Sequence, residues 1–215
     1  RDLLPEKLGV KNSELYRAVM RLPKSCHRAG LKRLFGPQSQ EELTRFLSSH
    51  NDVGPYDLRG ATLYGLSEIA RSEQFPRLLK ERNWESVERF IRTSHDGDRV
   101  SLHDGGAVKP YRSGIGDALL TRLSQQDADL TDQCGRYACS TEPIDAVVDI
   151  ANTVEGVIGA QLAGAGLGGC AMILVRQRGL ETLLRRLRGE FYRPRKIPFA
   201  AYVCQPVAGA GLIGV

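Results

Sequence analysis

The residues best suited to chemistry lie in one glycine-rich run, Gly159-Ala-Gln-Leu-Ala-Gly-Ala-Gly-Leu-Gly-Gly-Cys170. Its five glycines have no Cβ, so the backbone can turn tightly and approach a ligand closely. Apolar residues flank the run at 157–158 and 171–175. A flexible loop held between two buried strands can point backbone N–H groups at phosphate. The alternative is a glycine-rich hairpin that lets a neighbouring element pack closely, and it stays open at this point.

Two nucleotide-binding loops have similar letters, and the context disfavours both. Residues 164–169 satisfy the pattern G-x-G-x-x-G, which recurs at 209–214. The dinucleotide fingerprint requires a helix to begin in the loop, whereas strand-forming residues follow Gly169 and end at Arg176. A P-loop requires Gly-Lys followed by Ser or Thr, and no such sequence follows.

The histidines and cysteines form no recognisable metal or catalytic set. The spacings of four candidates fit no standard zinc pattern: His95, His103, Cys134 and Cys139. We therefore predict no metal site in this chain, and no signature of a cysteine hydrolase is present. His95 follows Ser94 at the end of an expected helix, where a cation complements the helix dipole. Glu68 and Arg71 are three residues apart and are expected to pair on one helix face.

The first two thirds of the chain read as helices. Residues 1–56 predict short helices broken at Pro23, at Gly30, at 36–37 and at 54–55. A helix is expected from Leu58, with Pro76 kinking or dividing it. A second helix follows Asn83, a candidate N-cap. Turn residues fill 96–98 and 103–106, and further helices are expected over 115–123 and from about 141, with a proline tolerated in the first turn.

Strands enter in the last third. Short β-like runs are expected at 157–162, 171–175 and 199–204, with an amphipathic helix over 179–191 between the second and third. This order predicts an α+β fold, in which a helical first half precedes an antiparallel sheet covered by helices on one face.

Composition and charge are those of an ordinary globular protein. The 215 residues are 41% hydrophobic and 26% charged, no apolar stretch is long enough to span a membrane, and no signal peptide is evident. Five cysteines without a C-x-x-C pair favour reduced thiols in a cytoplasmic protein. Residues 176–196 hold eight basic and two acidic residues. This charge predicts a solvated helix face in preference to the alternative, a surface that binds nucleic acid. The chain begins without methionine, so we expect a processed or truncated polypeptide.

Four motifs in order resemble the GHMP kinases, in particular the galactokinases. The glycine run resembles the third motif of that superfamily, G-A-R-M-T-G-A-G-F-G-G-C in galactokinases. Tyr64-x-x-x-Glu68-x-x-Arg71 looks like their H-x-x-x-E-x-x-R helix, and residues 90–95 look like their L-M-x-x-S-H segment. Ser140-Thr-Glu-Pro-Ile-Asp145 is similar to S-x-P-E-L-D, with one residue of slack. The resemblance covers 58–205, about two thirds of the chain.

The resemblance implies the C-terminal half of an ATP-dependent sugar kinase that transfers the γ-phosphoryl group to a monosaccharide hydroxyl with Mg²⁺. It implies a ferredoxin-like antiparallel sheet covered by helices over 58–215, with 1–57 as a helical segment leading to an N-terminal kinase domain. That domain, which has no counterpart here, carries the phosphate loop and the catalytic aspartate. No catalytic residue is therefore assigned in this chain. The implied nucleotide contacts are Gly164, Ala165, Gly166, Gly168 and Gly169, and His95 is a candidate for the substrate cleft.

The chain also departs from the family pattern. Ala163 stands where the family has Thr or Ser, so a hydroxyl that could bond a phosphate is lost. Tyr64 replaces a histidine, and residues 96–139 are longer than expected. These departures suggest a branch related to galactokinase. They also keep a second hypothesis open, a non-catalytic binding or regulatory module with a kinase-like fold. The sugar and the oligomeric state do not follow from the sequence.

Overall fold

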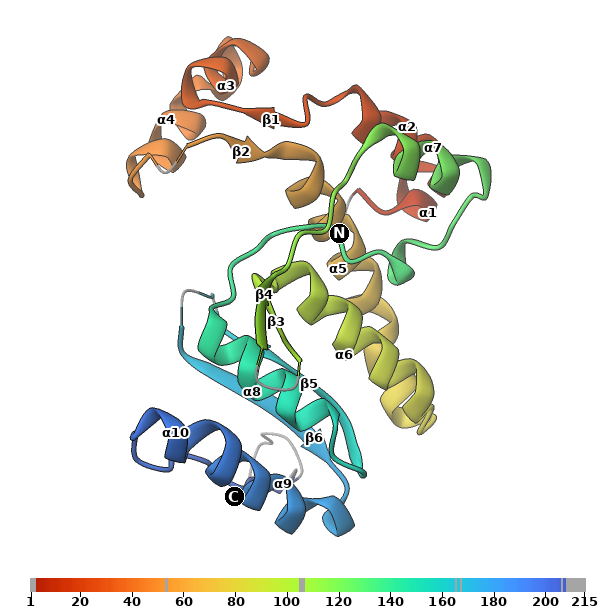
Figure 1. The fold of residues 1–215 in the computed structure, drawn as a ribbon. Coiled ribbons are helices and arrows are strands. Elements are labelled where there is room, and N and C mark those ends of the chain that lie inside the picture. Colours follow the sequence, from red (N-terminus) through yellow and green to blue (C-terminus); the bar gives the residue numbers. More distant parts are fainter. Residues whose placement is uncertain are drawn as a thin grey trace, which may run out of the picture.

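The fold is described from a computed structural model of the chain, over residues 3–52, 54–104, 107–164, 166, 168–205 and 207 (Figure 1). Short elements make up the N-terminal part: α1 (Pro5–Leu8), α2 (Asn12–Arg21), β1 (Ser25–Cys26), α3 (Arg28–Leu34), η1 (Pro37–Ser39), α4 (Gln40–Ser48) and β2 (Tyr56–Asp57). The expected break at Gly30 is wrong, since Gly30 lies inside α3. A Cβ there would lie 2.4 Å from Sγ of Cys26, so close packing explains this glycine.

Two long helices lie side by side in the centre of the fold, α5 (Leu58–Lys80) and α6 (Trp84–Asp98) (Figure 1). The predicted N-cap is confirmed, because Oδ1 of Asn83 accepts from the N–H of Ser86 at 3.1 Å. The sequence predicts that Pro76 kinks or divides this helix. In the structure α5 continues through Pro76 and is not divided. Leu78, beyond the proline, is buried in a cluster with Val87 of α6, and this packing offsets the hydrogen bond that Pro76 cannot make.

Helix α6 runs further than expected and includes residues 96–98, which had been predicted as a turn. The N–H of Arg99 bonds the carbonyl of His95 at 2.9 Å and closes the last helical turn. A hairpin follows, β3 (Ser101–Asp104) and β4 (Ala107–Pro110), and then α7 (Asp117–Gln125) and η2 (Leu130–Asp132). Helix α7 begins two residues later than expected. It shares a buried cluster with α2 and α5, centred on Tyr16, Leu63 and Leu120.

The C-terminal layer is a hairpin between helices. It consists of α8 (Glu142–Asn152), β5 (Val157–Ala163) and β6 (Cys170–Val175), and β5 pairs antiparallel with β6 from Val157↔Val175 to Ala163↔Cys170. Side chains alternate along the strands, but a β-bulge between Val157 and Gly159 shifts the register at the start of β5. Ile158 accordingly packs with α6, as does Leu174 of β6, whereas Ala160 and Leu162 pack with α8. Helices therefore cover both faces of the hairpin, where one covered face was expected.

Helical turns follow β6: η3 (Gln177–Gly179), α9 (Leu180–Arg186), the π-helical η4 (Leu187–Tyr192) and α10 (Arg193–Arg195). Among them α9 and η4 pack on α8. The strand expected at 199–204 is wrong, since these residues carry no regular structure. The ring of Phe199 packs on Tyr192 at 5.0 Å, and the Tyr192 hydroxyl donates to the carbonyl of Ala200 at 2.9 Å. These contacts hold the segment along the helix. The α+β class is confirmed, with three two-stranded antiparallel sheets among the described residues.

A glycine in β5 tests how tightly the hairpin meets α6. A Cβ at Gly159 would lie 2.8 Å from Cγ2 and 2.9 Å from Cβ of Ile91. We expect Gly159→Ala to lower the free energy of unfolding by about 1–3 kcal/mol, measured by urea denaturation. Gly65→Ala is the control: Gly65 lies in α5 with nothing within 4 Å of an added Cβ, so a gain of about 0.5–1 kcal/mol is expected. Equal effects at both positions would contradict the packing described.

Candidate functional site

Residues 164–169 of the glycine run link β5 to β6. The backbone conformation of the described residues in this loop requires glycine. The φ angles are +97° at Gly164, +89° at Gly166, +118° at Gly168 and +97° at Gly169, a region that side chains with a Cβ rarely adopt. Ala165, the remaining predicted nucleotide contact, and the second glycine pattern at 209–214 lie outside the described residues. Close packing, the second sequence hypothesis, holds at Gly166, and phosphate binding stays a prediction.

Close packing occurs at Gly166. A Cβ on this residue would lie 2.5 Å from the carbonyl oxygen and 2.8 Å from Sγ of Cys139. The Cys139 thiol donates in turn to Oδ1 of Asp98 at 3.2 Å. The N–H of Ser140 bonds the Asp98 carbonyl at 2.8 Å, so this segment lies against the last turn of α6. One side of the glycine run therefore rests on Cys139 and, through it, on α6.

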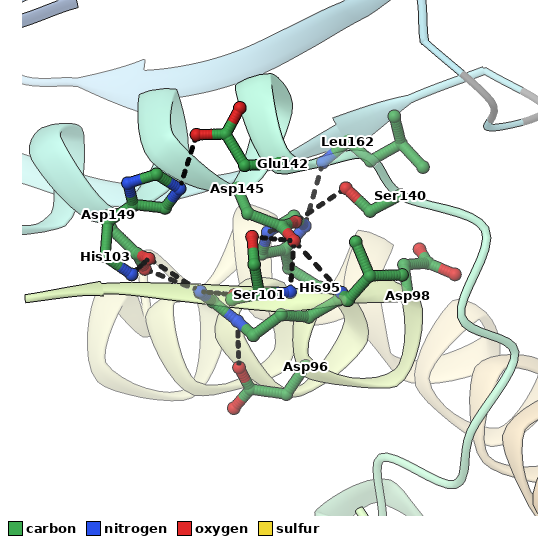
Figure 2. Close-up of polar contacts among 12 residues, drawn as sticks. His95, Asp96, Asp98, Ser101, His103, Ser140, Glu142, Asp145, Asp149 and Leu162 are labelled. Atoms are coloured by element: carbon green, nitrogen blue, oxygen red, sulfur yellow. Dashed lines mark hydrogen bonds and ion pairs between the residues drawn. The ribbon is translucent and has the colours of Figure 1, made fainter. Parts of the chain in front are cut away.

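A buried carboxylate, Asp145 of α8, lies at the centre of the site (Figure 2). Its Oδ1 accepts from the Ser140 hydroxyl at 2.6 Å, and its Oδ2 accepts from the hydroxyl of Ser101 at 3.0 Å. Two backbone N–H groups also reach Oδ2, from Val100 at 3.0 Å and Ser101 at 2.8 Å. Asp145 thereby connects the start of α8 with the chain that leaves α6.

His95 lies in the last turn of α6 and is only 1% exposed. Its Nε2 is 3.3 Å from Oδ1 of Asp145, and its Nδ1 accepts from the N–H of Leu162 in β5 at 3.2 Å (Figure 2). The position near the helix end agrees with the sequence. The place of His95 relative to a substrate stays a prediction, because both ring nitrogens are directed at protein groups in this structure.

A second polar network ties β3 to α8. The buried guanidinium of Arg99 lies 2.7 Å from Oδ1 of Asp149 and 3.2 Å from Oδ1 of Asp96. The N–H of His103 donates to Asp149 at 2.8 Å, and Nε2 of His103 lies 3.1 Å from Oε1 of Glu142 (Figure 2). These pairs fasten the β3–β4 hairpin to α8.

Burial and hydrogen bonding shift several pKa values in opposite directions. Burial by itself raises the pKa of Asp145, but hydrogen bonds from His95, Ser140 and two backbone N–H groups outweigh it and hold that pKa at about 2. Burial raises the pKa of Asp98, against hydrogen bonds from Cys139 and Tyr64. Burial and the neighbouring Asp98 raise the pKa of Cys139 to about 12. At neutral pH Asp145 is thus a buried anion, and the Cys139 thiol is a poor nucleophile.

The structure brings the four sequence motifs together. The predicted pair of Glu68 and Arg71 is confirmed, and Arg71 also donates to the carbonyls of Thr131 at 2.9 Å and Gln133 at 2.7 Å. Tyr64, from the same motif, lies beside Asp98. Sequence reasoning missed the roles of Asp98 and Cys139. The available signal for Cys139 was its position directly before Ser140.

Two other features singled out in the sequence are the possible metal ligands and the basic segment 176–196. Among the residues that the structure describes, no group of three or more His, Cys, Asp or Glu side chains could hold a metal ion. In the basic segment 176–196, Arg186 pairs with Glu190, Arg195 pairs with Glu142, and Arg176 lies over the ring of Trp84 at 5.6 Å. Part of the positive charge of this segment is therefore paired with other side chains of the same chain. Within the described ranges, no helix is both long and apolar enough to cross a membrane.

The fold and site define an α+β domain whose glycine-rich hairpin contacts Cys139 and His95, and His95 in turn faces the buried Asp145. Comparison with known proteins shows what this domain is similar to. Residues 113–193 match the family described as GHMP kinases C terminal. A galactokinase of Roseiflexus sp. is 31% identical over 91 residues, which are 42% of this chain and 22% of the relative. A galactokinase of Streptomyces coelicolor is 28% identical over 177 residues, 78% of this chain and 43% of the relative.

These matches support a galactokinase-like C-terminal domain of the GHMP kinase type within the residues matched. A galactokinase of Clostridium beijerinckii is also similar, with 35% identity over 55 residues, 26% of this chain and 14% of the relative. The chain spans less than half the length of these curated relatives. No solved structure matches the chain significantly.

The depressed pKa of Asp145 predicts a pH dependence of stability. Because this pKa is about 2 in the folded state and about 3.8 otherwise, the ionised carboxylate stabilises the fold above pH 4. That contribution, about 2 kcal/mol, is lost as the pH falls from about 4 to about 2. We expect Asp145→Asn to destabilise the chain by about 2–4 kcal/mol at pH 7 and to flatten this acid limb in urea denaturation. Asp104→Asn, at an exposed position, should change neither by more than about 0.5 kcal/mol.

The contact between Gly166 and Cys139 has a matched control in Gly164. Both glycines have positive φ, but nothing lies within 4 Å of a Cβ added at Gly164. Both substitutions to alanine incur the same backbone strain, and only Gly166→Ala also meets the Cys139 carbonyl. We expect Gly166→Ala to cost about 1–3 kcal/mol more than Gly164→Ala in the free energy of unfolding. An equal loss for both variants would show that the run does not rest on Cys139.

Proposed function

We propose that this chain is the C-terminal part of an ATP-dependent sugar kinase, one that transfers the γ-phosphoryl group of ATP to a monosaccharide hydroxyl. The galactokinase-like product would be a sugar 1-phosphate, and the enzyme would act in the cytoplasm. Residues 58–215 would form the C-terminal kinase domain. Residues 1–57 would lead to an N-terminal domain that supplies the phosphate loop and the catalytic aspartate.

One observation carries the proposal: the four motifs that resemble the family, far apart in sequence, lie together in space. His95 contacts Asp145 at 3.3 Å and Leu162 at 3.2 Å, while Gly166 lies against Cys139, the residue before Ser140. A sheet hairpin of structural glycines alone would not require the histidine, the serine and the aspartate in this arrangement. These contacts fix Leu162 and, through Cys139, Gly166 against α6, and a loop that binds phosphate needs such fixed points.

In this proposal the chain's own part is to position the nucleotide. Backbone N–H groups around Gly164, Gly166, Gly168 and Gly169 would face the phosphates, with Ala165 between the first two. Mg²⁺, when bound, would neutralise phosphate charge during transfer. The described residues offer no cluster of carboxylates for it, so we assign its ligands to ATP and to the N-terminal domain.

The non-catalytic alternative is favoured by Ala163, the last residue of β5, where the family has a hydroxyl. In that case the chain would keep the fold and bind nucleotide weakly or not at all. A titration of the chain with ATP and Mg²⁺ addresses this directly, because a loop that meets phosphate is expected to give a dissociation constant in the millimolar range or below.

The kinase proposal is tested on the full-length protein that contains this chain. We expect it to transfer phosphate from ATP to at least one member of a panel of monosaccharides, galactose included, as measured by ADP release and by mass of the sugar phosphate. The activity should disappear when Mg²⁺ is chelated. Full-length protein that folds yet phosphorylates none of the sugars would instead support the non-catalytic module.

A further inference from the structure

The hydrogen bonds of His95 determine which of its ring nitrogens carries the proton. Nδ1 accepts from the N–H of Leu162 at 3.2 Å, so Nδ1 has a free lone pair. In a neutral imidazole one nitrogen donates and the other accepts, which places the hydrogen on Nε2. The contact with β5 alone therefore selects the Nε2–H tautomer.

The opposite side of the ring selects the same tautomer independently. Nε2 lies 3.3 Å from Oδ1 of Asp145, which also receives the Ser140 hydroxyl at 2.6 Å. The ionised carboxylate has only acceptors, so the nitrogen that faces it must carry a hydrogen. Asp145 is 0% exposed and has no access to solvent as an alternative partner. The contact of Nε2 with Asp145 is a charge contact without full hydrogen-bond geometry, whereas Nδ1 makes a hydrogen bond with Leu162.

The N–H of Leu162 needs this partner because of its place in the sheet. Among the described residues β5 pairs with a strand, β6, on one edge only. Leu162 is buried, and a buried N–H without an acceptor is unfavourable. Nδ1 of His95 thus takes the place that a neighbouring strand's carbonyl would have.

We propose that His95 is a positioning residue for the glycine run: it bonds Leu162, two residues before Gly164, and so sets where β5 ends and the loop of residues 164–169 begins. The other side of the run rests on Cys139, which bonds Asp98 one turn further along the same helix. Helix α6 thereby aligns the run from both sides. The inference extends the proposed function, since the aligned N–H groups are those assigned to the phosphates of ATP.

The tautomer can be measured in the chain without any variant. We expect the ¹⁵N chemical shifts of His95 to show a protonated Nε2 and an unprotonated Nδ1 at pH 7, with a hydrogen-bond coupling from the Leu162 amide to Nδ1. A protonated Nδ1, or an amide of Leu162 that exchanges as fast as an exposed one, would overturn the proposal.

Two variants separate the two hydrogen bonds. His95→Asn places an amide oxygen where Nδ1 was and keeps an acceptor for Leu162, whereas His95→Gln reaches toward Asp145 and removes that acceptor. We expect the Leu162 amide to stay protected from hydrogen exchange in the Asn variant and to exchange at least about tenfold faster in the Gln variant. Equal exchange in both variants would contradict the assigned role.

In the full-length protein the same pair gives a kinetic test. The Gln variant should raise KM for ATP about tenfold, with KM for the sugar unchanged, and the Asn variant should restore KM for ATP to within about threefold of the native value. A loss of kcat alone, equal in both variants, would overturn the positioning role. If the full-length protein transfers no phosphate, the kinase proposal fails, and the tautomer and exchange measurements still decide the placement of His95.

Discussion

The structure depends on one buried anion, the carboxylate of Asp145. Burial penalises its charge, and the hydrogen bonds from three different segments outweigh that penalty. The groups that face it come from α6, from Val100 and Ser101 at the start of β3, and from Ser140, two residues before α8. A fully bonded anion of this kind tolerates little displacement of any donor. The relative positions of α6, β3 and α8 are therefore coupled through a single side chain.

Asp145 positions the glycine run indirectly, through His95, which contacts both. His95 passes the constraint from Asp145 to β5, and Cys139 connects the run to Asp98 on the same helix. Glycines allow the loop its unusual φ angles, but the same freedom would leave an isolated loop with many conformations. Two anchors on one rigid helix reduce that number. This explains how a flexible sequence can present backbone N–H groups in a defined arrangement, which binding of phosphate requires.

Much of the local structure was predictable. The hairpin strands, the start of α8 with Pro143 in its first turn and the Asn83 cap follow from patterns within about ten residues. The errors arose where packing overrode such patterns. Pro76 remains inside α5 because both sides of it pack on α6, and residues 96–98 stay helical because they face Cys139 and Ser140. Phe199 follows its aromatic partner Tyr192 instead of pairing with β6.

The glycine run, the strands on either side of it and the order of the four family-like motifs can be read from neighbouring residues. The contacts that these motifs make with one another arise from the packing of the whole chain. The partners of His95 are 50 and 67 residues away along the chain, and Cys139 meets Asp98 across 41. No periodicity or spacing links residues so far apart. Their contacts exist only because burial of the helix and strand faces brings α6, α8 and the hairpin together.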